Sequence, residues 1–70
     1  MTNEVRIEAF EEIMELEEGT LNENSVLDDF EEWDSMTKLS IIAESKKIFG
    51  KDISGSDLKA CSTVSDLLKL

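Results

Sequence analysis

The stretch DSMTKLSIIAESKKIFG, residues 34–50, decides the fold of this 70-residue chain. Asp34 is a typical N-cap and Gly50 a typical stop signal, so the spacing predicts a helix from Ser35 to about Phe49. Ile42 and Phe49 are expected to be largely buried. A helix with apolar residues on two sides is central and contacts more than one neighbour. One broad apolar face consists of Met36, Leu39, Ile42, Ala43 and Phe49, and Ile41 and Ile48 lie on another.

A first helix is expected from a cap at Thr2 or Asn3 to about Glu17, and Gly19 is a natural stop. Apolar residues recur there at helical spacing while glutamates gather on the opposite side, which predicts an amphipathic helix with a solvated acidic face. The apolar set is Val5, Ile7, Ala9, Phe10, Ile13, Met14 and Leu16, and the glutamates are Glu8, Glu11, Glu12 and Glu15.

Residues 18–33 contain turn-forming residues, but they are too apolar for a solvated linker. A loop this long in a small domain is usually functional or packed by its own side chains. We therefore expect its apolar residues to cover one end of the helices. These residues are Leu21, Val26, Leu27, Phe30 and Trp33.

The C-terminal part of the chain predicts two more helices. Residues 54–60 suggest a short third helix, and Thr63 with Asp66 three residues later resembles a capping box that opens a last helix. The sequence thus predicts an all-α fold of four helices, one very short, after a long first loop. One domain spans residues 1–70. The inward-facing residues are Ile53, Leu58, Val64, Leu67 and Leu68.

Charge divides the chain at Asp34-Ser35. The net charge is −10, with −12 in residues 1–34 and +2 in residues 35–70. Such acidity disfavours nucleic acid and favours basic partners. The sequence shows no signal peptide and no apolar run of membrane-spanning length, so a monomer in the cytoplasm is expected.

Conventional catalysis has few candidates in this sequence. The chain has no His, no Tyr and no glycine-rich phosphate loop, so we expect no enzyme. The acidic run from Asp28 to Asp34 lacks the spacing of a calcium loop, and no metal site is expected. Cys61 is interpreted as a small core residue rather than a reactive thiol. Trp33 is either a loop anchor or a partner contact, and we favour the anchor.

Ser35 stands just inside the start of the central helix. Taken alone, a serine there is usually only a good local residue. A phosphodiester on its hydroxyl would nevertheless be stabilised by the helix N-terminus, and the side chain would be within reach of another enzyme.

The sequence resembles the acyl and peptidyl carrier protein family. The motif Trp33-Asp34-Ser35-Met36 is similar to the family's D-S-L or D-S-M signature. It is followed by an apolar helix ending in Phe49-Gly50, by Asp52-Ile53, and by Thr63-Val64 at the start of the last helix. The order of these segments is much more specific than D-S-M alone, and the resemblance covers nearly the whole chain.

The resemblance implies a small four-helix up-down bundle. It implies that a phosphopantetheinyl transferase moves 4′-phosphopantetheine from coenzyme A to Ser35, whose arm then carries an acyl or aminoacyl thioester. Asp34 matches the aspartate that helps present the serine and the magnesium during transfer. Met36 matches the apolar position beside the arm. The implied partners are this transferase, a loading ligase and acyl-transfer enzymes.

The second helix departs from the pattern of fatty-acid-synthase carriers. Those carriers usually have an acidic second helix, whereas this chain has Ser40 and the lysines Lys38, Lys46 and Lys47. We expect the lysines to form the partner surface and the protein to be a free-standing acyl carrier of a dedicated pathway, of fatty-acid or polyketide type. An aminoacyl carrier, for example D-alanyl or peptidyl, and an acidic helical adaptor without the arm remain alternatives.

Overall fold

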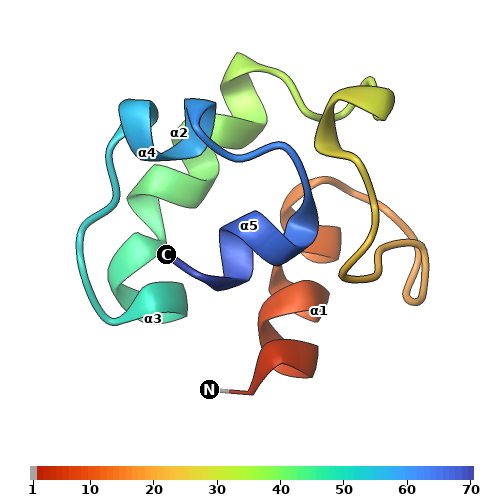
Figure 1. The fold of residues 1–70 in the computed structure, drawn as a ribbon. Helices are drawn as coiled ribbons and strands as arrows, with labels where there is room; N and C mark the ends of the chain where they lie inside the picture. The colour runs from red at the N-terminus through yellow and green to blue at the C-terminus, as the bar shows by residue number, and fades with distance from the viewer. Residues whose placement is uncertain (1) are drawn as a thin grey trace.

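The computed structural model describes residues 2–70 (Figure 1). The described residues contain no strand, which confirms the all-α class, and only one isolated bridge, between Val26 and Thr63. No helix in this part of the chain is long and apolar enough to cross a membrane. The α-helices are α1 (Asn3–Ile13), α2 (Ser35–Ala43), α3 (Ser45–Phe49), α4 (Gly55–Lys59) and α5 (Val64–Leu68), and the 3-10 helix η1 covers Leu27–Asp29.

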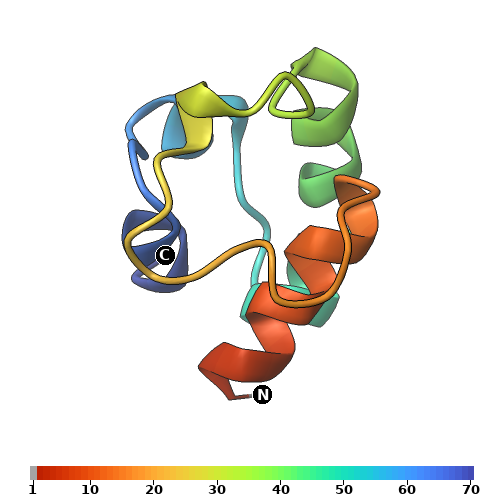
Figure 2. The same ribbon diagram turned by 90° about the vertical axis from the view of Figure 1, so that its right-hand side faces the viewer.

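Helix α2 is the centre of the fold. It contacts α1, α3 and α4, and α5 packs against α1. Helices α1 and α2 run in opposite directions, and the long first loop passes along one side of the molecule (Figures 1 and 2). The start of α2 therefore lies at the opposite end of the molecule from the start of α1.

The predicted second helix is two helices. It breaks at Glu44, whose φ of −100° and ψ of 8° are not helical, so the structure has five α-helices where four were predicted. The Ser45 hydroxyl donates to the Ile42 carbonyl over 2.8 Å, a local hydrogen bond that competes with the helical pattern. Ser45 lies inside the span that was predicted to be one continuous helix, so this break was not predicted.

The burial of α2 and α3 confirms the prediction for Phe49 but not for Ile42. Met36, Leu39 and Ala43 are exposed, and Ile42 is only half-buried. The buried stripe follows the spacing i, i+4, i+8 and i+11 and includes two polar residues, which a search for apolar side chains passes over. Its members are Thr37, Ile41, Ser45 and Ile48, with Phe49 beside them as expected.

Helix α1 is shorter than predicted. Thr2 is its cap, with the side chain accepting from the Val5 N–H, but the helix ends at Ile13 and not near Glu17. Glu15 has a φ of +58°, a left-handed conformation that turns the chain away. Phe10 and Met14 are the buried apolar residues of this region.

Glu11 does not belong to the solvated acidic face that the sequence predicted. Its side chain is only 3% exposed, and its Oε2 accepts a hydrogen bond of 2.9 Å from the Leu21 N–H. A buried carboxylate requires such a partner. The other predicted members of that face, Glu8, Glu12 and Glu15, are exposed.

The long loop covers one end of the helices, as predicted. Leu21, Leu27 and Trp33 are buried and Phe30 is partly buried, whereas Val26 is exposed. Three backbone hydrogen bonds connect the loop to residues 62–65, at the start of α5. These run from Leu27 N–H to Ser62 O, from Val64 N–H to Ser25 O and from Ser65 N–H to Glu23 O, at 2.9, 3.0 and 2.9 Å.

Both short C-terminal helices begin with capping boxes. Ser54 pairs with Asp57 at α4, and Thr63 pairs with Asp66 at α5, the latter as predicted. Of the expected inward residues, only Leu68 is partly rather than fully buried. The fully buried ones are Ile53, Leu58, Val64 and Leu67.

Candidate functional site

The site begins at the junction of the long loop and α2. Asp34 has an extended backbone, and its Oδ1 accepts a hydrogen bond of 2.9 Å from the Thr37 N–H. This bond holds the pKa of the Asp34 carboxyl group below its usual value. The cap fixes Ser35 as the first residue of α2.

Ser35 is exposed to solvent at this first helical position. Backbone N–H groups in the first turn have no partner within the helix, and the helix dipole favours negative charge there. A phosphate ester on the Ser35 hydroxyl would therefore find a favourable electrostatic environment, and an approaching enzyme would reach the hydroxyl from outside.

A groove of about 520 Å³ opens beside Ser35, between α2 and α4. Helix α2 contributes residues at i, i+3, i+4 and i+7 from the serine, which is one face of a helix. Helix α4 supplies the opposite wall. The lining residues are Ser35, Lys38, Leu39, Ile42, Gly55, Ser56 and Lys59.

Two large apolar side chains stand exposed near Ser35. Met36 is 72% exposed and Leu39 is 61% exposed. Leu39 lines the groove beside Ser35, and exposed apolar surface of this kind marks sites for ligands or partners. The resemblance to carrier proteins already assigned such a place to Met36, but not to Leu39.

Trp33 anchors the loop that delivers Ser35. Its side chain is only 8% exposed, which agrees with the anchor interpretation. The Lys38 ammonium lies 5.5 Å from the centre of the Trp33 ring, within the range of a cation–π contact. The tryptophan thus orients one of the two lysines of the groove.

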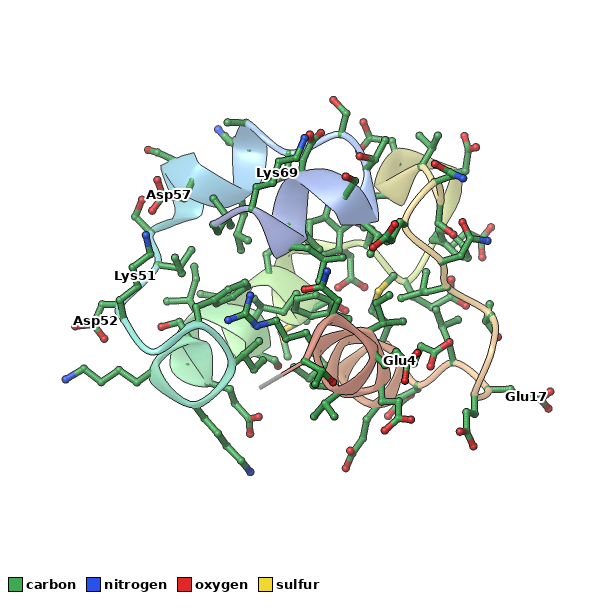
Figure 3. All side chains as sticks on the ribbon, turned by 60° about the horizontal axis from the view of Figure 1, so that its bottom comes forward. Glu4, Glu17, Lys51, Asp52, Asp57 and Lys69 are labelled. Carbon is green, nitrogen blue, oxygen red and sulfur yellow. The ribbon has the colours of Figure 1, made fainter. Side chains whose placement is uncertain are left out.

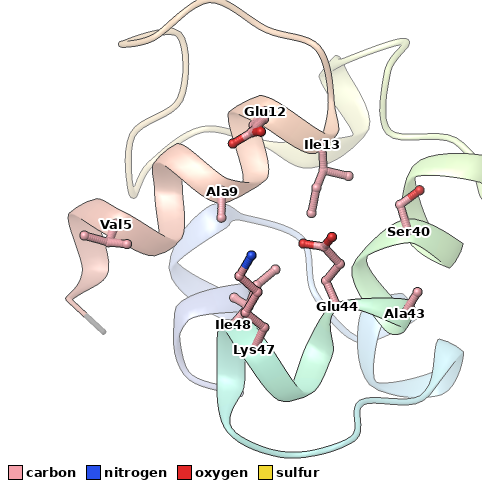
Figure 4. A pocket seen from close by; sticks show the side chains of 9 residues that line it. All are labelled: Val5, Ala9, Glu12, Ile13, Ser40, Ala43, Glu44, Lys47 and Ile48. Atoms are coloured by element: carbon pink, nitrogen blue, oxygen red, sulfur yellow. The ribbon is translucent and has the colours of Figure 1, made fainter.

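The structure does not gather the three lysines of the expected partner surface in one place. Lys38 lines the Ser35 groove, and the Lys46 Nζ lies 4.0 Å from the Asp52 Oδ2. Lys47 lines a separate groove of about 550 Å³ between α1 and the α2–α3 segment, where it faces α1 (Figure 4). Lys59 replaces them as the second cation near Ser35.

Lys59 and the groove were not predicted from the sequence. The spacing of Lys38, Leu39 and Ile42 from Ser35 could have predicted that these residues share one face of the helix. The position of Lys59 could not be predicted in this way, because it depends on how α4 packs against α2.

Charge remains unevenly distributed in the folded protein. Glu4 and Glu17 lie on the side of α1 and the long loop, whereas Lys51, Asp52 and Asp57 lie toward the α3–α4 connection on the other side (Figure 3).

Within residues 2–70 no group of three potential ligands could hold a metal ion.

Cys61 is part of the hydrophobic core, as interpreted from the sequence. Its Sγ lies 3.4 Å from the Asp57 carbonyl oxygen. Burial raises the pKa of the Cys61 thiol, which keeps it protonated and unreactive.

The fold and the exposed serine define a small helical module that presents one hydroxyl at a helix N-terminus. Comparison with family models matches residues 7–70 to the phosphopantetheine attachment site family. The chain belongs to this family, whose members are carrier proteins and not catalysts. No curated protein and no solved structure matched the chain.

The cofactor of this protein is covalently bound 4′-phosphopantetheine. When bound, it supplies a thiol that holds cargo as a thioester. The residues at the start of α2 fit the group, since the Ser35 hydroxyl is exposed beside an open groove that has both apolar and cationic side chains. The family also implies a modifying transferase and acyl-handling enzymes as partners.

Proposed function

We propose that this protein is an acyl carrier protein that holds its cargo as a thioester on a phosphopantetheine arm attached to Ser35. The observation that carries the proposal is the exposed Ser35 at the capped start of α2, beside the groove. Asp34 is proposed to help present this serine to the transferase. Met36 is proposed to border the arm.

Several other serines have their hydroxyls engaged. Ser45 is buried and donates to Ile42, Ser40 donates to the Met36 carbonyl, and Ser54 belongs to a capping box. These local hydrogen bonds favour Ser35 as the attachment residue.

The attachment is tested by incubating the protein with coenzyme A, magnesium and a broad-specificity phosphopantetheinyl transferase. Intact-mass measurement should show one added phosphopantetheine on the parent and none on Ser35→Ala. Ser40→Ala is the matched control because Ser40 is an exposed serine on the same helix. Modification that persists in Ser35→Ala would refute the assignment, and the absence of any modification would favour the adaptor alternative.

An acyl cargo is favoured over an aminoacyl cargo by the charge of the groove. Lys38 and Lys59 line it, and no carboxylate does. An aminoacyl thioester carries an ammonium group, which these lysines would repel. The aminoacyl alternative, D-alanyl or peptidyl, uses the same arm and the same serine.

The two cargo classes are separated by thermal melts of loaded protein. The transferase can attach the arm from octanoyl or D-alanyl coenzyme A, which yields two forms that differ only in cargo. We expect the octanoyl form to have a higher melting temperature than the form with an unloaded arm. The D-alanyl form should show no such increase. A larger rise for the D-alanyl form would make the protein an aminoacyl carrier.

The lysines outside the groove support a dedicated pathway. Lys46 and Lys47 on α3 are exposed and place positive charge where fatty-acid-synthase carriers are usually acidic. Together with Lys38 they are proposed to select partner enzymes by charge. Electrostatic complementarity of this kind mainly sets the rate and specificity of encounter.

A further inference from the structure

The groove beside Ser35 has the opposite charge to the chain as a whole. The protein carries a net charge of −10, yet the side chains that line this groove include two lysines and no acid. The lysines come from different helices, Lys38 from α2 and Lys59 from the last position of α4. Two lysines and no acid in the lining of one groove indicate a subsite for an anion.

A phosphodiester on Ser35 would be stabilised further by such a subsite. It would add a negative charge next to Asp34, in a chain whose first 34 residues already carry −12. Like charges that are close together disfavour one another unless a cation compensates them. The cap also occupies the Thr37 N–H, so this donor of the first turn is already used.

The packing of α4 explains why Lys59 is available. Leu58 is fully buried and anchors α4 to the core, while Lys59 next to it is exposed at the rim of the groove. Lys38 is half-buried and lies against the Trp33 ring, so its ammonium has less freedom than that of an ordinary surface lysine. Below the lysines, Leu39 and Ile42 offer apolar contact.

We propose that Lys59, together with Lys38, binds the phosphodiester of the arm and directs its first part into the groove between α2 and α4. Leu39 and Ile42 then contact the dimethyl-substituted carbon that follows the phosphate in pantetheine. This inference rests on the proposed attachment at Ser35. It assigns Lys59 a positioning role and concerns the arm itself, before any cargo is loaded.

The test compares ¹⁵N-labelled protein before and after attachment of the arm, without cargo. Intact mass first establishes that the arm is present. In the parent, amide signals of α4, including Ser56 and Lys59, should shift on attachment as well as those at the start of α2. In Lys59→Gln the α4 shifts should fall to less than half, and Lys38→Gln with Lys59→Gln should abolish them.

Lys47→Gln is the matched control, because it removes one exposed lysine that lines the other groove. It should leave the α4 shifts unchanged. Raising the salt concentration should reduce the shifts in the parent, since exposed charges are screened. Spectra of the variants without the arm should match that of the parent, which shows that each variant is folded.

The outcomes separate this inference from the proposed function. If no arm is attached, the Ser35 proposal fails and this one falls with it. If the arm is attached but α4 does not respond, or responds equally in Lys59→Gln, the phosphodiester subsite is refuted while the carrier function stands. If α4 responds only after a dicarboxylic acyl group is loaded, the anion is a cargo carboxylate, which also overturns the proposal.

Discussion

The Glu11 carboxylate on α1 accepts a hydrogen bond of 2.9 Å from the backbone N–H of Leu21, and both residues are buried. This single contact connects the end of α1 to the long loop that later delivers Ser35. The same carboxylate satisfies a loop donor that would otherwise be buried without a partner.

Removing the Glu11 side chain should therefore destabilise the protein. Glu11→Ala leaves the Leu21 N–H without its acceptor, which typically costs about 1–3 kcal/mol of unfolding free energy. Glu8→Ala is the matched control, because Glu8 is exposed on the same helix, and its effect should stay within about 0.5 kcal/mol. Urea unfolding followed by circular dichroism measures both. Equal stabilities of the two variants would show that the contact contributes little.

The buried stripe of α2 predicts that alanine substitutions of two adjacent isoleucines reduce the unfolding free energy by different amounts. Ile41 is fully buried and Ile42 is half-buried at the groove. Ile41→Ala should cost about 2–5 kcal/mol, and Ile42→Ala clearly less. A 70-residue domain has a total stability of only about 4–10 kcal/mol, so Ile41→Ala should lower the thermal midpoint strongly. A larger loss for Ile42→Ala would mean that the wrong face has been assigned to the core.

Acid should weaken the cap of α5. Asp66 accepts hydrogen bonds from the Ser62 and Thr63 N–H groups at 2.9 and 3.1 Å, and these bonds lower the pKa of its carboxyl group from its usual value. Because the folded pKa is the lower one, the ionised cap stabilises the protein above the unfolded pKa. This contribution is lost as the pH falls through the folded value.

The stability difference between the parent and Asp66→Ala should accordingly be larger at about pH 6 than at about pH 3. Denaturant unfolding at both pH values measures it. Asp52→Ala serves as control, since Asp52 is exposed and caps no helix. A difference for Asp66→Ala that does not change with pH would show that the charge of the cap is irrelevant.

Partner choice should respond to the charge of α3. The rate of malonyl transfer from a fatty-acid-synthase transferase to the parent should be low, even with the arm attached, because the docking surface of such a partner complements an acidic helix. Lys46→Glu with Lys47→Glu should increase the transfer rate severalfold. The gain should be larger at low salt, where the screening length is long enough for α3 to act on a partner at Ser35. Efficient transfer to the parent would leave the dedicated-pathway proposal without support.

Local signals in the sequence were enough to place the site. The Asp34 cap, the Thr63–Asp66 capping box and the D-S-M motif predicted the helix starts, because caps depend on neighbours in the chain. The prediction that Ser35 is exposed at the start of the second helix is confirmed. The assignment of Ser35 as the attachment residue stays a prediction.

Features that depend on tertiary contacts were missed. The burial of Glu11 requires a loop donor ten residues away, and Lys59 enters the groove only through the packing of α4. The buried stripe of α2 includes Thr37 and Ser45, which hydropathy alone assigns to the surface. Tertiary packing overrides such local preferences.

The bridge between Val26 and Thr63 determines when the long loop can fold during synthesis of the chain. It joins the loop before Ser35 to a segment that leaves the ribosome much later, since synthesis runs from the N-terminus. Until residues 62–65 have emerged, the loop lacks the partners of its backbone hydrogen bonds. Ser35 is synthesised early, but the loop before it reaches its folded conformation only after residues 62–65 have emerged. A transferase that recognises the folded surface would therefore modify chains in which these residues have emerged in preference to shorter nascent chains.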